Sequence, residues 1–201
     1  MNTGHITAQL PVHIRGLFDS YDCTKLLYHN FQHTERVVFH TAEIVDHYEL
    51  DSHYSFILQA AAWFHDTGQL TGDMHVHEER SVQFMQDFFS GKTNDRTMVH
   101  CIADCIMATK MSAAPRNLPE EIICDADTYH LGTTDFKQLD QRVWRELELR
   151  LNKPIEDQAG KSLVFLEEHR FYTAYCQVRL SAGKEKNIAM LKEIIQNKVA
   201  K

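Results

Sequence analysis

The residues best suited to catalysis or metal binding include an adjacent histidine and aspartate, His65 and Asp66. They follow an apolar run from Phe56 to Phe64 and precede a glycine-containing stretch at residues 67–72. The run predicts a buried helix, and the glycines indicate where that helix ends. An imidazole and a carboxylate at the inner end of a buried helix cost free energy unless a partner offsets their burial. A divalent cation would be such a partner, because it binds both a neutral imidazole nitrogen and a carboxylate oxygen.

The alternative is that Asp66 caps the next turn and His65 is a core histidine with satisfied hydrogen bonds. Two further residues favour the metal. His33 lies at the start of a predicted helix, on its inward face, and Asp127 lies inside an apolar helix much later in the chain. Helical bundles build metal sites from inward side chains on facing helices.

Two imidazoles and two carboxylates make a mixed nitrogen and oxygen ligand set. Such a set suits one divalent transition metal (Mn²⁺, Fe²⁺, Ni²⁺, Co²⁺ or Zn²⁺) better than Ca²⁺. Because the set holds no thiolate, a closed structural zinc site fits less well. Four protein ligands on an octahedral ion would leave two positions for water and a substrate oxygen, as in a hydrolytic centre.

These residues must be positioned by helices. Eight glycines and four prolines in 201 residues leave little room for the closely spaced turns of an all-β fold, and no period-two alternation is sustained. Apolar residues recur instead at helical spacing. We therefore predict an all-α, compact bundle of about 8–10 helices that forms a single domain over residues 1–201. The expected helices are residues 5–19, 33–48, 53–66, 77–89, 96–109, 120–131, 138–151, 160–172 and 181–198.

Composition and charge narrow the class of partner. The net charge is −7, from 21 basic and 28 acidic residues, and no basic patch appears, so tightly held nucleic acid is not expected. No apolar run approaches the ~20 residues of a spanning helix, and the N-terminus lacks the features of a signal peptide. Five cysteines without a CxxC pair favour a reduced, cytoplasmic compartment. The sequence leaves a homo-oligomer open.

These residues resemble the motifs of a known family. His33, His65-Asp66 and Asp127 resemble the H…HD…D pattern of the HD superfamily of metal-dependent phosphohydrolases. Residues 28–33, Tyr-His-Asn-Phe-Gln-His, are similar to its Tyr-His-Asn-x-x-His motif. Four stretches resemble a bacterial branch usually described as predicted HD phosphohydrolases: Ala-Ala-Trp-Phe-His-Asp at 61–66, Glu-Glu-Arg-Ser at 78–81, Ile-Met-Ala-Thr at 106–109 and Asp-Ala-Asp at 125–127. The resemblance covers about residues 20–195 and implies a bundle of the HD-domain type.

The resemblance implies a metal-dependent phosphoric ester hydrolase. It would hydrolyse a phosphate ester of a small molecule, such as a nucleotide, by a metal-bound hydroxide. It assigns the metal to His33, His65, Asp66 and Asp127, and Asp66 is also counted as catalytic. Two alternatives stay open: a phosphodiesterase that opens a cyclic or alarmone nucleotide, and a non-catalytic HD module that binds metal or nucleotide.

Further roles are suggested around the metal. His29 is nominated by the resemblance as the acid that protonates the leaving alkoxide, and the alternative is a packed or capping histidine. Glu78 or Glu79 would orient the attacking water, although a first-turn carboxylate is also favoured by the helix dipole. Arg80 and Lys110 are candidate phosphate contacts, with solvated surface charge as the alternative. His130, three residues after Asp127, is expected to lie behind the ligands.

The sequence departs from the family pattern in three places. Ser112 stands where the bacterial branch often has a histidine. Gln69 stands where cyclic-nucleotide phosphodiesterases continue His-Asp-x-x-His, which argues against that activity. Two-metal members use extra histidines, and neither His77 nor His100 falls in the matching place. We therefore expect one metal ion.

Overall fold

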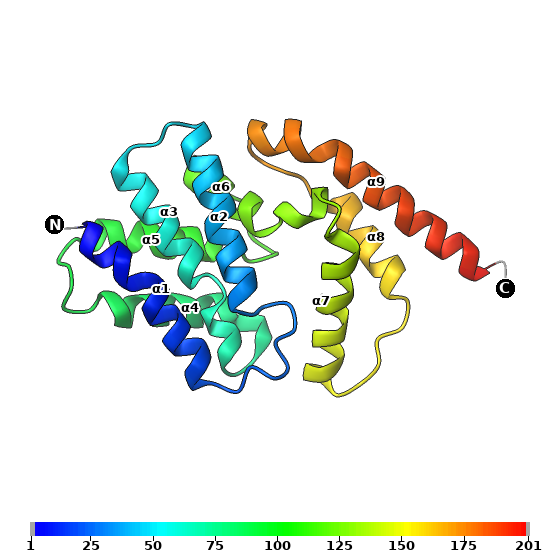
Figure 1. Ribbon diagram of the computed structural model, residues 1–201, viewed down its shortest axis with the longest axis horizontal. Coiled ribbons are helices and arrows are strands. Elements are labelled where there is room, and N and C mark those ends of the chain that lie inside the picture. Colours follow the sequence, from blue (N-terminus) through cyan, green and yellow to red (C-terminus); the bar gives the residue numbers. More distant parts are fainter. Residues whose placement is uncertain (1–2, 200–201) are drawn as a thin grey trace. The chain divides into compact units, whose positions relative to one another are not determined.

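The computed structural model describes residues 3–199, which form helices and no strand (Figure 1). The prediction of an all-α fold with about 8–10 helices is confirmed, because nine α-helices occur in this range. They are α1 (Thr3–Ser20), α2 (Phe31–His47), α3 (Ser52–Phe64), α4 (His77–Phe89), α5 (Arg96–Ala108), α6 (Leu118–Asp127), α7 (Phe136–Leu151), α8 (Gln158–Glu168) and α9 (Ala174–Val199). Three short 3₁₀ helices are η1 (Thr67–Leu70), η2 (Met74–Val76) and η3 (Tyr129–Gly132).

The chain divides into two compact units, one ending at Asp127 and the other starting at Thr128. The single domain expected over residues 1–201 stays a prediction. Within residues 3–199, no helix combines the length and the apolar character needed to cross a bilayer.

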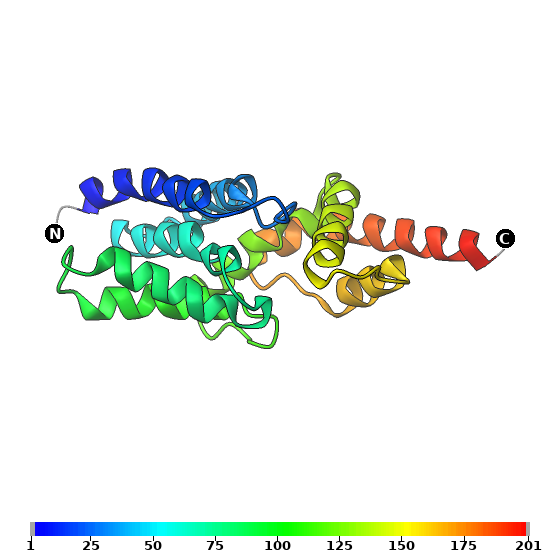
Figure 2. The same cartoon turned by 90° about the horizontal axis from the view of Figure 1, so that it is seen from below.

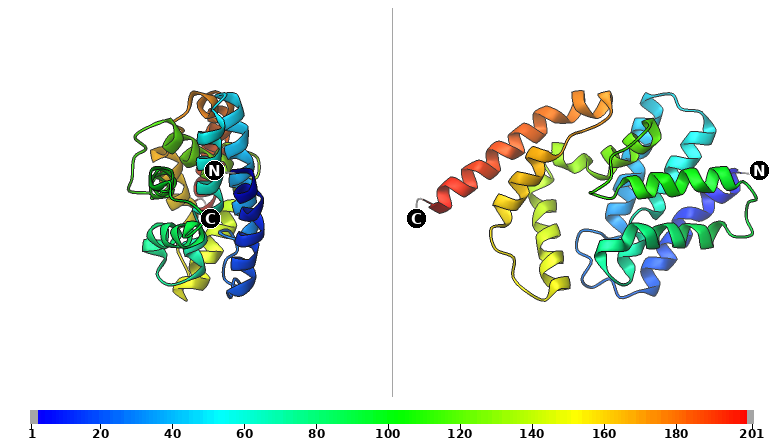
Figure 3. Two further views of the ribbon diagram at one scale, coloured as in Figure 1. Left: turned by 90° about the vertical axis from the view of Figure 1, so that its left-hand side faces the viewer. Right: turned by 180° about the vertical axis from the view of Figure 1, so that it is seen from behind.

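The first unit is built around α3. Figure 2 shows α3 between a layer formed by α1 and α2 and a layer formed by α4 and α5, and Figure 3 shows α4 and α5 side by side. A helix covered on several sides must be apolar nearly all round. The sequence meets this requirement, since α3 buries Phe56, Ile57, Leu58, Ala60, Ala61, Ala62, Trp63 and Phe64. The predicted buried helix is therefore the centre of this unit.

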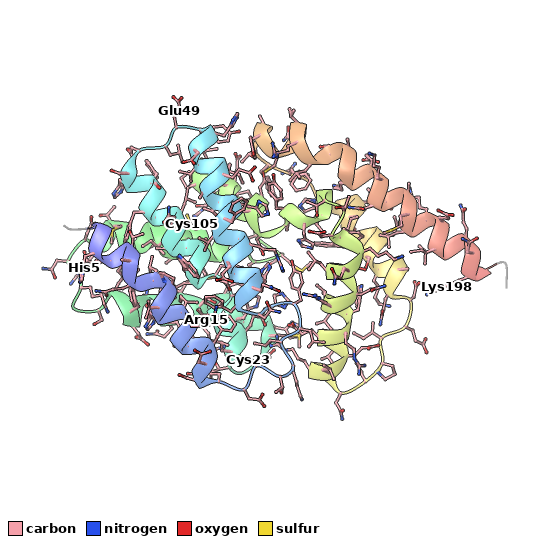
Figure 4. All side chains as sticks on the ribbon, in the orientation of Figure 1. His5, Arg15, Cys23, Glu49, Cys105 and Lys198 are labelled. Atoms are coloured by element: carbon pink, nitrogen blue, oxygen red, sulfur yellow. The ribbon has the colours of Figure 1, made fainter. Side chains whose placement is uncertain are left out.

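Side-chain caps set where the helices of the first unit begin. The Asn30 side chain accepts a hydrogen bond from the backbone N–H of His33 at 3.1 Å, and Asp51 and Asp95 cap α3 and α5 in the same way. Arg15 projects from α1, and its guanidinium carbon lies 3.5 Å from the ring centroid of Phe31 at the start of α2 (Figure 4). The beginning of α2, and with it His33, is thus held by both a cap and a cation–π contact.

Three predicted helix boundaries differ from the structure by more than two residues. The helix expected over residues 120–131 ends at Asp127 and continues as η3. The helix expected over 160–172 ends at residue 168, because His169 adopts an extended conformation. The last helix starts at Ala174 instead of residue 181, because the Thr173 hydroxyl accepts a hydrogen bond from the Cys176 N–H at 3.2 Å and caps it.

The second unit packs α9 against η3 through two glycines. A Cβ added at Gly183 would lie 1.9 Å from the carbonyl oxygen of Gly132, so only glycine permits this approach. The Asn187 side-chain amide secures the contact by donating to the carbonyl oxygens of Leu131, at 2.8 Å, and Thr133, at 2.9 Å. Backbone contacts therefore hold η3 in place within the second unit. Such contacts leave no simple hydrophobic pattern in the sequence.

Candidate metal centre

The end of α3 places His65 and Asp66 inside the first unit. A helix leaves its last carbonyl oxygens without intrahelical partners, and buried carbonyls need replacements. His65 supplies two: its N–H donates to Ala61 O and its Nδ1–H donates to Ala62 O, both at 2.8 Å. The Thr67 hydroxyl donates to Phe64 O at 2.8 Å. The residues around the His-Asp pair therefore bind three of the carbonyl oxygens at the end of α3.

Two other elements bring in His33 and Asp127. His33 lies in the first turn of α2, behind its Asn30 cap. Asp127 is the last residue of α6, which contacts α2, α3 and α5. The start of α6 is fixed by Asn117, which accepts from the Glu120 N–H at 3.0 Å and donates its amide to that carboxylate at 2.9 Å. This reciprocal arrangement resembles a capping box, except that the Glu120 carboxylate accepts from the side-chain amide of Asn117 and not from its backbone N–H.

The structure brings the four predicted ligands together. His33 Nε2 lies 3.3 Å from His65 Nε2, 3.2 Å from Asp66 Oδ2 and 3.1 Å from Asp127 Oδ1. His65 Nε2 lies 3.2 Å from Asp66 Oδ2 and 3.6 Å from Asp127 Oδ1. The nearest ligand atoms of His33, His65 and Asp127 all lie within 4.8 Å of one another. His33, His65 and Asp66 are buried, and the Asp127 side chain keeps 25% of its surface exposed.

The spacing fits a transition-metal site. Two ligands bonded at about 2.1 Å and separated by 90–110° lie roughly 3.0–3.4 Å apart, which is close to the observed distances. The tautomer of His65 points the same way. A carbonyl oxygen can only accept, so Nδ1 of His65 carries a proton, and Nε2, which faces the carboxylates, is the nitrogen that could bind a metal. Metal-bound histidines commonly donate their other ring N–H in this manner.

An orphaned atom supports the same interpretation. Asp66 Oδ2 is fully buried and has no hydrogen-bond partner among the described residues, although both imidazole Nε2 atoms lie 3.2 Å away. The orientation of the two rings does not give these contacts hydrogen-bond geometry. Buried carboxylate oxygens without a partner are costly, and a cation at the centre of the four ligand atoms would remove that cost.

The electrostatics of the site keep both carboxylates ionised. Burial opposes ionisation of Asp66, but His65, His29 and His33 outweigh it and hold the pKa of Asp66 well below its usual range. Burial is likewise outweighed at Asp127, where His33 and His65 lower the carboxyl pKa. Burial disfavours the charged form of His65, yet Asp66 and Asp127 hold the pKa of His65 well above its usual value. The pocket thus favours positive charge among these groups.

His77 borders the centre, although sequence reasoning did not place it there. Its Nδ1–H donates to Met74 O at 2.7 Å, and its Nε2 lies 3.4 Å from Asp66 Oδ1. Burial lowers and the Asp66 carboxylate raises the pKa of His77, with a net upward shift. The next residue, Glu78, is buried, and its Oε2 has no hydrogen-bond partner among the described residues.

The remaining predicted residues separate into near and distant groups. The His29 ring centroid lies 5.9 Å from that of His33, beside the centre. Glu79 is exposed and pairs with Lys110, whose Nζ lies 2.5 Å from Glu79 Oε1. The hydrogen bond with Lys110 lowers the pKa of Glu79. His100 is 78% exposed and its Nε2 lies 3.7 Å from Asp104 Oδ2, so it forms no part of the ligand cluster.

Arg80 directs its guanidinium at backbone. Its Nε and Nη2 donate to Gly68 O at 3.1 and 3.0 Å, and Nη2 also donates to Asp73 O. Periodicity places Arg80 on α4, but no sequence signal identifies carbonyl oxygens as its partners. The same holds for His77, whose approach to Asp66 depends on the path of residues 67–76.

Comparison with other proteins adds no relative. No family model, curated protein or solved structure matches the chain. The case for a metal centre therefore rests on the ligand geometry described above.

Proposed function

We propose that the protein is a metal-dependent phosphohydrolase of the HD type, which hydrolyses a phosphate ester of a small molecule such as a nucleotide. One observation carries the proposal: His33, His65, Asp66 and Asp127 direct ligand atoms at one point, and Asp66 Oδ2 lies there buried without a hydrogen-bond partner. The motif resemblance of the sequence agrees with this site. One divalent ion per chain fits the four residues.

The four ligands would hold the ion, which supplies Lewis-acid chemistry by lowering the pKa of water and offsetting phosphoryl charge. His65 keeps the required tautomer because Ala62 O holds its Nδ1–H. Asp66 and Asp127 stay ionised, because the neighbouring imidazoles lower their pKa values. Helices α2 and α6 and the two residues that follow α3 would provide the ligands, so the geometry is set by the packing of these elements.

Protons would be handled by groups beside the ligands. His29 is part-buried next to His33 and would protonate the leaving oxygen of the ester. Of the two adjacent glutamates, Glu78 suits the orientation of the attacking water, because its carboxylate is buried and Oε2 lacks a hydrogen-bond partner among the described residues. Glu79 is bound to Lys110 at 2.5 Å, so its charge is already compensated. Substrate contacts by Arg80 and Lys110 stay predictions.

The decisive experiment measures metal before activity. Protein purified and then loaded with Mn²⁺, Co²⁺, Ni²⁺ or Zn²⁺ is expected to retain about one ion per chain by elemental analysis. Asp66→Asn removes a ligand charge while keeping the side-chain shape, and should lose the ion. Asp87→Asn alters an exposed aspartate on α4 and should retain it. A wild-type protein that binds none of these metals would contradict the proposal.

The loaded protein is then tested on phosphomonoesters, cyclic nucleotides, alarmones and deoxynucleoside triphosphates. Hydrolysis of a monoester that Asp66→Asn abolishes supports the proposal. Turnover of cyclic or alarmone nucleotides alone would replace it with a phosphodiesterase activity. A bound ion with no turnover on any class would leave a binding module.

A further inference from the structure

The loop that follows the candidate ligand Asp66 is wrapped around one arginine. Residues 68–73 return their backbone towards the first turns of α4, and the guanidinium of Arg80 lies among them. Its Nε and Nη2 both donate to Gly68 O, and Nη2 donates again to Asp73 O. Gly72 adopts a positive φ of 65° beside it, and a Cβ there would lie 3.3 Å from the guanidinium carbon. One side chain therefore joins both ends of this loop.

A second contact fixes the same loop from the other side. The Gly68 N–H donates to the Ser81 hydroxyl at 2.8 Å. A Cβ on Gly68 would lie 1.9 Å from His77 O, so the loop and α4 meet backbone to backbone. Both polar backbone groups of Gly68 are thus bound by adjacent residues of α4, Arg80 and Ser81. This arrangement leaves Gly68 little freedom to move relative to the helix.

The anchored loop leads directly to the Asp66 carboxylate. Asp66 is the residue before η1, and its carbonyl oxygen accepts from the Gln69 N–H at 2.9 Å. From the first turn of α4, His77 Nε2 approaches Asp66 Oδ1 at 3.4 Å. A shift of the loop relative to α4 would therefore move the Asp66 carboxylate away from His33 and His65. Metal ligands held by such outer contacts lose affinity when those contacts are removed.

We propose that Arg80 is a positioning residue that holds the Asp66 carboxylate in place by clamping Gly68 O and Asp73 O. The inference rests on the proposed function, because it takes Asp66 as a ligand. The Nε and Nη2 edge of arginine is the edge that commonly grips a phosphate with two parallel bonds. Here that edge is occupied by backbone oxygens, so it is not free to grip a phosphate in this way.

The substitution Arg80→Lys tests the clamp, because it keeps the positive charge and the aliphatic stem but loses the planar fork. We expect the affinity for Co²⁺ or Mn²⁺ to fall about 10–100-fold. Amide hydrogen exchange of residues 67–73 should accelerate in the metal-free protein, with unchanged helix content by circular dichroism. Arg96→Lys is the matched control, because Arg96 is exposed at the start of α5, and neither readout should change.

Chemical rescue separates the clamp from general destabilisation. In Arg80→Ala, guanidinium chloride well below denaturing concentration should restore part of the metal affinity, and sodium chloride at the same concentration should not. Should Arg80→Ala fail to fold, the Lys substitution decides the question. Unchanged metal affinity and loop exchange in Arg80→Lys, with a raised KM for a phosphorylated substrate, would overturn the clamp and leave the proposed function intact. If the wild type binds no metal, the proposed function fails, and loop exchange in the metal-free variants still tests whether Arg80 anchors the loop.

Discussion

His65 serves two purposes with its two ring nitrogens. Nδ1–H closes the end of α3 on Ala62 O at 2.8 Å, and Nε2 faces Asp66 Oδ2 at 3.2 Å and Asp127 Oδ1 at 3.6 Å. The hydrogen bond that ends the helix also fixes the tautomer that a metal requires. The end of the helix therefore orients His65 before any substrate or ion is bound.

The neighbouring pair His29 and His33 allows ligand and acid to be separated. His33→Ala should lose metal and activity together, because its Nε2 lies among the ligand atoms. His29→Ala should keep the metal and lower turnover about 10²–10⁴-fold. That loss should shrink for p-nitrophenyl phosphate, because a good leaving group hardly needs protonation. The measurements are metal content and kcat for an alkyl and a p-nitrophenyl ester.

An unchanged rate on the alkyl ester in His29→Ala, with metal bound, would show that His29 is only a packing residue. His53→Ala provides the control, because His53 is an exposed histidine in the first turn of α3. It should alter neither metal content nor either rate.

The four candidate ligands could be singled out from their residue types and their positions on the predicted helices. Each combines a ligating side chain with a place on an inward helix face, and a bundle can bring such faces together. His77 and Arg80 could not be predicted in this way. The approach of His77 to Asp66 and of Arg80 to Gly68 O depends on the path of residues 67–76 and on carbonyl oxygens, which every residue type presents equally.

At the scale of the element, α3 determines both core and site. Leu58 is fully buried near the middle of this helix. Leu58→Ala should lower the free energy of unfolding by about 2–5 kcal/mol, because it removes packed atoms and leaves a cavity. Val12→Ala is the control, because Val12 on α1 is 74% exposed and makes little packing contact. Chemical denaturation of both variants measures the difference, and equal stabilities would contradict the central role of α3.

The fold was predictable to the level of helices but not to all of their ends. Apolar periodicity identified the positions of α2, α4 and α5 because each has one clear buried face, and a continuous apolar run identified α3. It missed the start of α9 at Ala174, where Cys176 and Leu180 are the only buried residues of the helix before residue 181 and a Thr173 cap sets the boundary. The Gly132–Gly183 approach was equally hidden, since it depends on the absence of side chains.

A half-buried carboxyl in the second unit gives a pH test. Asp140 accepts a hydrogen bond from Ser162 at 2.7 Å, yet burial outweighs this bond and raises the pKa of Asp140. A carboxyl with a folded pKa above its unfolded value binds its proton more tightly in the native state. Its contribution to stability therefore falls as pH rises from the unfolded pKa through the folded pKa.

Asp140→Asn keeps the accepting oxygen and removes the charge. We expect the variant to be more stable than the wild type at pH 7, and the difference to vanish once Asp140 is protonated at acidic pH. Urea unfolding at both pH values measures this, with Glu156→Gln on the exposed surface as the control. A loss of stability at pH 7 would show that the ionised form is favoured.

At the scale of the whole molecule, the candidate centre joins segments that are far apart in the chain. His33, His65-Asp66 and Asp127 come from α2, the end of α3 and the end of α6. An ion bound by all three would oppose their separation on unfolding. The net charge of −7 also makes cation binding favourable at long range.

Metal removal should therefore lower thermal stability. An ion that binds only the native state at 100 times its Kd stabilises it by about 2.7 kcal/mol. For a chain of this size that corresponds to a Tm change of roughly 5–10 °C. We expect EDTA to lower the Tm of the metal-loaded wild type by this amount and to leave Asp66→Asn almost unchanged, while Asp87→Asn should respond like the wild type. Differential scanning calorimetry measures these changes in Tm. Equal responses of Asp66→Asn and the wild type to EDTA would place the bound ion elsewhere in the molecule.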